Sequence, residues 1–214
     1  MNQGLDCGGW KGKQRPEGII CPPAFSYPHP PWPVKTLFLG WNPPGTTHFW
    51  NSNQDRLRLG LREVLTALGW DSNEDLIGQF LKRGCYLVHV VRCWPKAKFP
   101  DPHGELGVQL VATCARSLLD PTLSDLQPEW IVALGKVPHI ALHALGLDVP
   151  RPSRKFPYTV GWHGTIGSYK IIITCFPNTW PIDRRKPDGL KNRDCTIAAL
   201  KKWWGAPWPR CGDD

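Results

Sequence analysis

Polar groups suited to chemistry follow the ends of four predicted strands. The apolar segments at residues 36–40, 85–91, 130–134 and 169–174 lead to or contain Asn42, His89, Lys136 and Asn178. An amide such as that of Asn42 can orient a water molecule, and a neutral imidazole can donate one hydrogen bond and accept another. Backbone N–H groups at the start of a helix, expected after Gly135, can hold a phosphate. These groups share one site only if their strands run parallel.

The spacing of apolar residues predicts helices between these strands. Leu57, Leu61, Val64 and Leu68 recur with helical spacing after Asp55, a suitable N-cap, and stop at Gly69. Further helices are expected at residues 73–81, 105–119, 137–145 and 189–204. Apolar strands that alternate with helices indicate a parallel sheet covered on both faces. We therefore expect an α/β fold, a three-layer α/β/α arrangement with a central, mainly parallel four-stranded sheet.

The arrangement predicts where a ligand would bind. In such a sheet, ligands bind outside the carboxyl ends of the strands, which assigns the site to loops 41–54, 92–104, 135–137 and 175–187. A Pro-rich extension at 1–34 is expected to precede one domain at 35–206, followed by a short tail at 207–214.

Composition favours a polyanionic partner. The 214 residues carry 26 Lys and Arg against 18 Asp and Glu, a net charge of +8, and nucleic acid is the first candidate. The 12 tryptophans and 23 prolines suit stacking groups on rigid loops better than a helical bundle. No segment has the length of a membrane span or the apolar core of a secretory signal, so we expect a soluble, cytoplasmic protein. Its eight cysteines are then expected to be buried or metal-bound rather than paired.

Several ordered segments resemble one family. Residues 38–45, Phe-Leu-Gly-Trp-Asn-Pro-Pro-Gly, resemble the first motif of the uracil-DNA glycosylase superfamily, and 47–50, Thr-His-Phe-Trp, are similar to a stretch of its mismatch-specific and deoxyinosine branches. Residues 86–95 resemble the second strand of its iron-sulfur branch, and 130–136 and 171–178 resemble the third and fourth strands with their loops. The resemblance spans about 36–204.

The resemblance implies an enzyme that flips a damaged base out of DNA and hydrolyses its bond to deoxyribose. Such an enzyme needs a pocket, a group that fills the vacated space, and contacts to the DNA backbone. The catalytic residues would be Asn42, orienting the attacking water, and Asn178, hydrogen-bonding the base. The alternative for Asn42 is a simple turn former, because Asn-Pro is common in turns.

Base binding is assigned by the resemblance to Trp41, Phe49, Trp50, His89 and Phe176. His89 stands where the superfamily often carries an Asn, and Phe176 where many relatives carry a His. Phe49 and Trp50 would stack on the base; core packing is the alternative for both, as is a buried hydrogen-bonded core position for His89.

DNA contacts are assigned to Gly45, Lys136, Trp180, Arg184, Arg185 and Lys186. Trp180 would enter the base stack as a wedge, and the cations beside it would bind phosphates. The alternatives are a surface Trp packed on Pro181 and a solvated charged face.

The iron-sulfur branch further implies a structural [4Fe-4S] cluster held by Cys7, Cys21, Cys93 and Cys114, against the alternative of free buried thiols. Catalysis itself would need no cofactor.

The sequence therefore predicts a monomeric, monofunctional DNA glycosylase for a deaminated base, uracil first, acting on DNA and not on membranes. The rival predictions are a damage-binding protein of the same fold without turnover and an iron-sulfur protein without glycosylase activity. Base preference is not decided by the sequence.

Overall fold

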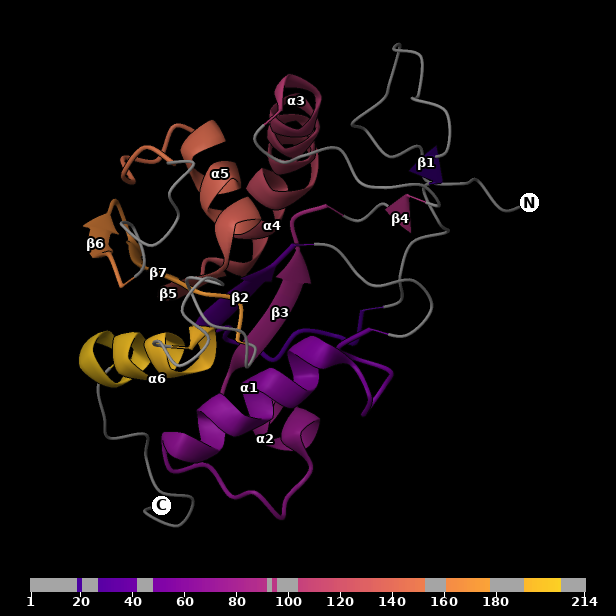
Figure 1. The fold of residues 1–214 in the computed structure, drawn as a ribbon, viewed down its shortest axis with the longest axis vertical. Coiled ribbons are helices and arrows are strands. Elements are labelled where there is room, and N and C mark those ends of the chain that lie inside the picture. The colour runs from indigo at the N-terminus through magenta and orange to yellow at the C-terminus, as the bar shows by residue number, and fades with distance from the viewer. Residues whose placement is uncertain are drawn as a thin grey trace.

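A five-stranded sheet forms the centre of the molecule (Figure 1). The computed structural model describes residues 19–20, 27–41, 48–91, 94–95, 104–152, 161–177 and 191–204. The strand order is β3-β2-β5-β7-β6, with bounds β2 (Thr36–Gly40), β3 (Cys85–His89), β5 (Trp130–Leu134), β6 (His163–Ile166) and β7 (Tyr169–Thr174). The first four strands in this order are parallel, and β6 is antiparallel to β7. A separate antiparallel pair joins β1 (Ile19–Ile20) to β4 (Trp94–Pro95).

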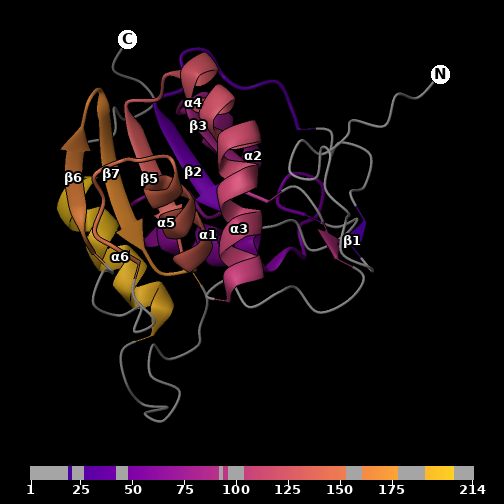
Figure 2. The ribbon, with the colours of Figure 1, turned by 90° about the horizontal axis from the view of Figure 1, so that it is seen from above.

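Helices cover both faces of the sheet, as the two views show (Figures 1 and 2). One face carries α3 (Glu105–Cys114), the π-helical segment η2 (Ala115–Leu119), α4 (Asp120–Leu126) and α5 (Lys136–Ala144). The other carries α1 (Arg56–Ala67), α2 (Leu76–Lys82) and α6 (Asn192–Trp203). This is the predicted three-layer α/β/α fold.

Alternation along the strands supplies both layers with apolar side chains. Leu37 and Leu39 pack with α3 and α5, whereas Phe38 between them packs with α1 and α2. Successive side chains of a strand point to opposite faces, so a strand covered on both sides must be apolar at every position. The continuous apolar runs in the sequence have this origin.

The helices that flank the predicted site start at capping carboxylates. The Asp55 side chain accepts a hydrogen bond from the backbone N–H of Arg58 at 2.9 Å, as expected for the N-cap of α1. Asp75 caps α2 in the same way, and its carboxylate also pairs with Arg58 Nη2 at 3.1 Å. The helix predicted from residue 73 therefore begins three residues later, at Leu76.

The sheet has one strand more than the four expected. β6 alternates between exposed and half-buried residues and lies at the sheet edge, so it lacks the continuous apolar run used to find the others (Figure 2). The turn that joins it to β7 contains Gly167 at φ +58°, a backbone angle that favours glycine. Within the described part of the chain, no helix has the length and apolar character needed to cross a membrane.

Candidate functional site

The carboxyl ends of four parallel strands meet at one edge of the sheet. Gly40 at the end of β2 is in register with His89 at the end of β3, and Leu134 of β5 is in register with Thr174 of β7. The neighbouring β2 and β5 are aligned at Leu39 and Ala133. The loops that the sequence assigns to a ligand site therefore leave the sheet from the same edge, which is where ligands bind in sheets of this kind.

His89 occupies this edge as a buried side chain, with 3% of its surface exposed. Its Nδ1 lies 3.1 Å from the hydroxyl oxygen of Tyr27, and its backbone N–H donates to the same oxygen at 3.4 Å. On its other side the ring faces Gly40: a Cβ built there would lie 3.1 Å from His89 Cδ2. The ring is thus held between the last residue of β2 and the segment that precedes the sheet, in the buried, hydrogen-bonded setting that was the alternative left open for His89.

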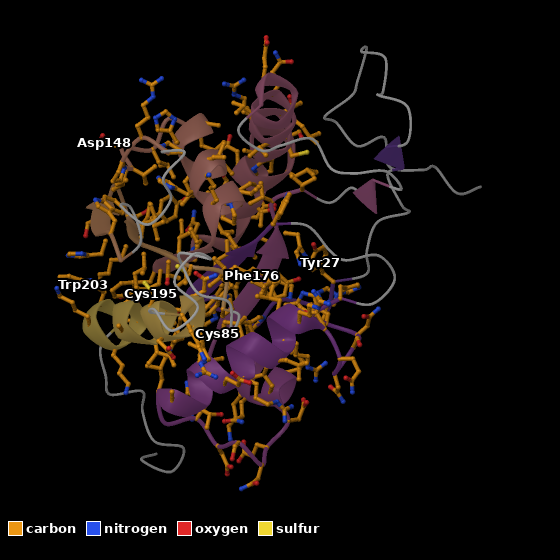
Figure 3. All side chains as sticks on the ribbon, in the orientation of Figure 1. Tyr27, Cys85, Asp148, Phe176, Cys195 and Trp203 are labelled. Carbon is orange, nitrogen blue, oxygen red and sulfur yellow. The ribbon has the colours of Figure 1, made fainter. Side chains whose placement is uncertain are left out.

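Tyr27 has no assigned role in the sequence analysis, although it contacts the predicted base-binding histidine. Figure 3 shows it beside the arrowhead of β3. Its segment is tied to β3 a second time, because Tyr86 donates from its hydroxyl to the carbonyl of Pro28 at 2.7 Å. A tyrosine in a Pro-rich extension gives no local signal of a partner 62 residues away.

The start of α5 also belongs to this edge. Gly135 has φ +97° and donates its N–H to the Thr174 carbonyl at 2.8 Å, so β5 turns sharply into the helix that begins at Lys136. Phe176 lies beside this turn: a Cβ on Gly135 would lie 3.5 Å from Phe176 Cβ. Lys136 and Phe176 are both half-buried, and the first N–H groups of α5 lie where a phosphate could bind.

The segment that returns from the first loop is largely core. Phe49 has no exposed surface and packs against Phe80 and Trp50, with ring centroids 5.3 and 4.9 Å away. Trp50 is half-buried, and its indole N–H donates to the Leu87 carbonyl at 3.1 Å. Phe49 is thus packed as a core residue, the alternative left open for it, whereas Trp50 keeps part of its surface exposed.

His48 precedes these aromatics and is another buried histidine that the sequence analysis left without a role. It is 4% exposed, and Nδ1 accepts a hydrogen bond from the backbone N–H of Trp50 at 3.3 Å. Burial lowers the pKa of His48 below its ordinary value, so the neutral ring is favoured. His48 directly follows residues 42–47, so its burial fixes the point at which the chain returns from this loop to the core.

The loop that leaves β7 is held at its start from two sides. The hydroxyl of Thr196 on α6 lies 3.1 Å from the Cys175 carbonyl, to which it donates. The thiol of Cys175 hydrogen-bonds Cys195, which raises the pKa of Cys175 together with burial and lowers the pKa of Cys195. On the opposite side, a Cβ on Gly60 of α1 would collide with the Pro177 carbonyl oxygen. Three contacts thus position the chain at the point where Asn178 follows.

Of the predicted site residues, the structure brings Trp41, His89, Lys136 and Phe176 to the carboxyl edge. Trp41 is half-buried, and its carbonyl accepts the N–H of Val91 at 2.9 Å, which extends the β2–β3 pairing by another step. Other predicted residues lie outside the described residues: Asn42, Gly45, Asn178, Trp180, Arg184, Arg185 and Lys186.

Comparison of the sequence with models of protein families identifies the family to which the chain belongs. The model of the uracil DNA glycosylase superfamily matches residues 29–203, which is most of the chain. The chain belongs to this superfamily. A search among curated proteins finds no match. The α/β sheet and the helices on both of its faces agree with the superfamily fold.

Superfamily members mostly need no cofactor. Of the four cysteines that the iron-sulfur branch implies as cluster ligands, the described residues include Cys114. Cys114 on α3 has no exposed surface and lies in the apolar layer between α3 and the sheet. Cys7, Cys21 and Cys93 lie outside the described residues, and within those described no group of three or more metal-binding side chains occurs. The described residues therefore do not form a cluster site by themselves.

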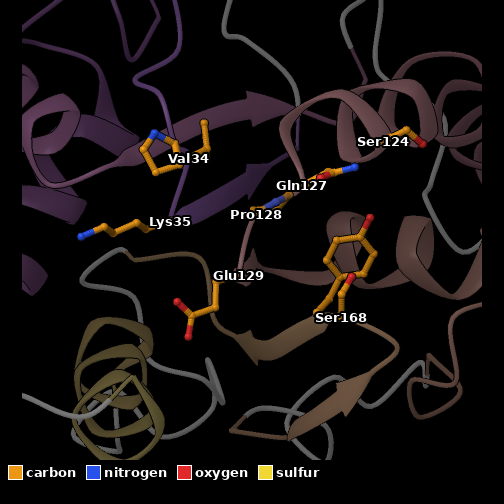
Figure 4. Close-up of a pocket in the computed structure, with 9 residues that line it drawn as sticks. Val34, Lys35, Ser124, Gln127, Pro128, Glu129 and Ser168 are labelled. Atoms are coloured by element: carbon orange, nitrogen blue, oxygen red, sulfur yellow. The ribbon is translucent and has the colours of Figure 1, made fainter.

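A cavity of about 750 Å³ lies at the opposite end of the sheet from the carboxyl edge (Figure 4). It is lined by residues at or before the starts of β2, β5 and β7: Pro33, Val34, Lys35, Ser124, Gln127, Pro128, Glu129, Ser168 and Tyr169. Its position at the amino ends of the strands separates it from the carboxyl edge, where ligands bind in sheets of this kind.

Proposed function

We propose that this protein is a monofunctional DNA glycosylase that flips a deaminated base, uracil first, out of DNA and hydrolyses its bond to deoxyribose. The product is DNA with an abasic site. The observation that carries the proposal is the family match over 29–203, in a chain whose four parallel strands end at one edge beside His89, Lys136 and Phe176.

The hydrolysis develops positive charge on the sugar and negative charge on the departing base. Fixed dipoles directed at those charges lower the barrier without a strong base. In this proposal Asn42 orients the attacking water through its amide, and Asn178 hydrogen-bonds the base as it leaves. His89 hydrogen-bonds the edge of the base, while Trp41, Trp50 and Phe176 supply apolar contact around it.

DNA is held by groups around the same edge. The first N–H groups of α5 and the Lys136 ammonium bind one phosphate, and Gly45 permits a close approach of the first loop to the backbone. Arg184, Arg185 and Lys186 bind further phosphates. Trp180 fills the space that the flipped base leaves, which offsets part of the unstacking cost of a few kcal/mol.

The partner in this proposal is DNA with a damaged base, and the protein acts as a monomer in the cytoplasm. The reaction uses water and needs no cofactor. The cluster ligated by Cys7, Cys21, Cys93 and Cys114 stays a prediction, to be checked by iron and acid-labile sulfide analysis of protein purified without oxygen.

A base-release assay tests the proposal. End-labelled duplexes and single strands with one uracil, hypoxanthine or xanthine are incubated with the full chain and then treated with alkali, which breaks the strand at abasic sites. We expect breaks at uracil, dependence on alkali, and a loss of roughly 100- to 1,000-fold in Asn42→Ala, the range for one positioned polar group. Absence of breaks with all three bases would contradict the proposal.

A second candidate is a damage-binding protein without turnover. It is favoured by Phe176, an apolar side chain beside Gly135 at the position where the resemblance leads us to expect a histidine. Tight binding to abasic DNA together with no release of any base would select this candidate.

A further inference from the structure

The segment before the sheet places a tyrosine hydroxyl on His89. The Tyr27 oxygen lies 3.1 Å from Nδ1 of the ring and 3.4 Å from the backbone nitrogen of the same residue, and the two rings are tilted at 43° with centroids 6.3 Å apart. Tyr27 therefore contacts both the backbone and the side chain of His89. It also lies just before residues 29–203, the part of the chain that matches the superfamily.

The chemistry of the two groups assigns the direction of the hydrogen bond. A phenol is a better donor than a neutral imidazole N–H, and an unprotonated imidazole nitrogen is a better acceptor than a phenol oxygen. The backbone N–H of His89 already donates to the Tyr27 oxygen, which suits an oxygen whose own proton points to Nδ1. A neutral imidazole that accepts at Nδ1 carries its proton on Nε2.

The edge of the ring that carries Nε2 faces the end of β2. A Cβ built on Gly40 would lie 3.1 Å from His89 Cδ2 and 3.5 Å from Nε2. Gly40 is followed by Trp41 and then by the loop that contains Asn42. The imidazole thus turns one nitrogen to Tyr27 and the other toward Gly40, the last residue of β2 before the loop that carries Asn42.

We propose that Tyr27 is a positioning residue that holds His89 as the Nε2–H tautomer, so that the site presents an N–H donor to the base and selects bases with a carbonyl oxygen there. This inference rests on the proposed function. Deamination replaces an exocyclic amine, a donor, with a carbonyl oxygen, an acceptor. A fixed N–H donor accepts uracil and opposes cytosine, because two N–H donors cannot bond to each other.

The tautomer is measured directly in protein labelled with ¹⁵N-histidine. Long-range ¹H–¹⁵N correlation spectra near pH 8 distinguish the two tautomers by the ¹⁵N shifts of the ring, and His89→Gln identifies the signals of His89. We expect Nε2–H in the wild-type protein and a shift toward a mixture of tautomers in Tyr27→Phe. Tyr86→Phe is the matched control, because it removes the hydrogen bond to Pro28 from the same segment and leaves the Tyr27 hydroxyl in place.

Kinetics supply the second measurement. Tyr27→Phe is expected to lower kcat/KM on uracil about three- to tenfold, the effect of one neutral hydrogen bond, and to reduce the preference for uracil over cytosine. Tyr86→Phe should leave that preference unchanged. An Nδ1–H tautomer in the wild-type protein, an unchanged tautomer in Tyr27→Phe, or equal shifts in both variants would overturn the role of Tyr27.

The two proposals fail separately. The tautomer experiment needs no turnover, so it upholds or overturns the role of Tyr27 even in a protein that releases no base. Absence of base release in the wild-type protein contradicts the proposed glycosylase and not the tautomer assignment.

Discussion

Gly60 of α1 faces the backbone carbonyl of Pro177 so closely that a side chain at position 60 would occupy the place of that carbonyl oxygen. The contact joins the first helix to the start of the loop that follows β7. Because backbone atoms rather than a flexible side chain stand in the way, one of the two segments must move to admit a methyl group.

Gly60→Ala should therefore destabilise the protein by about 1–3 kcal/mol, the usual cost of overpacking, despite the better helix propensity of alanine. Urea denaturation measures the loss. Gly78→Ala in α2 is the matched control: its Cβ would meet just Asp75 Oδ2 within 4 Å, at 3.5 Å, so a gain of up to about 1 kcal/mol is expected. If Gly60→Ala is as stable as the wild type or more stable, the Pro177 backbone can move at little cost and the prediction is wrong.

Gly40→Ala should affect activity more than stability. Its Cβ would lie 3.1 Å from His89 Cδ2 and 3.3 Å from Leu57 Cδ2, so the imidazole must give way by a few tenths of an ångström. Displacement of a group proposed to contact the base should reduce base release roughly ten- to a hundredfold. Kinetics and thermal unfolding are compared on the same preparation, with Gly78→Ala as the control. An unchanged rate would show that His89 can move without consequence.

Lys136→Ala tests the phosphate site proposed at the start of α5. Loss of one phosphate contact should weaken binding to all DNA sequences alike and reduce the slope of log K against log salt by about 1. Lys170→Ala is the comparison, because Lys170 lies near the amino end of β7 and pairs with Glu129 at 2.7 Å. Fluorescence anisotropy across a salt series measures both slopes. Equal slopes for Lys136→Ala and the wild type would place Lys136 away from the DNA.

His139 predicts a loss of stability in mild acid. This residue of α5 has no exposed surface; Nε2 lies 2.6 Å from the Pro150 carbonyl, and Nδ1 has no hydrogen-bond partner among the described residues. Burial, partly opposed by that hydrogen bond, lowers the pKa of His139 from its ordinary value of 6.5. The unfolded chain then binds more protons near and below this pH, so stability falls as the pH decreases.

His139→Gln keeps a donor for Pro150 and removes the titrating group. Between pH 7.5 and 5.5 the wild type should lose up to about 1.4 kcal/mol more than this variant, measured by urea unfolding at both pH values. Burial also lowers the pKa of His48. His48 therefore contributes a similar loss of stability in acid to the wild type and to the variant. Identical losses in the two proteins would contradict the assignment to His139.

Local patterns were sufficient for most of the framework. The apolar runs at 36–40, 130–134 and 169–174 are strands with the predicted bounds, and Asp55 is the predicted cap of α1. These features depend on neighbours within one turn or one strand, so a short sequence window contains their cause. The edge strand β6 was missed because one of its faces is not enclosed, and its residues need not be apolar.

The sequence by itself determined the α/β class and the strand ends at which a ligand site was expected. It also contained the family resemblance, which the family match confirms. The tertiary structure alone decided that Phe49 is core, that Tyr27 contacts His89, and that Gly60 abuts Pro177. The reason is physical: propensity and periodicity act between residues close in the chain, whereas these contacts arise only when packed layers bring distant segments together.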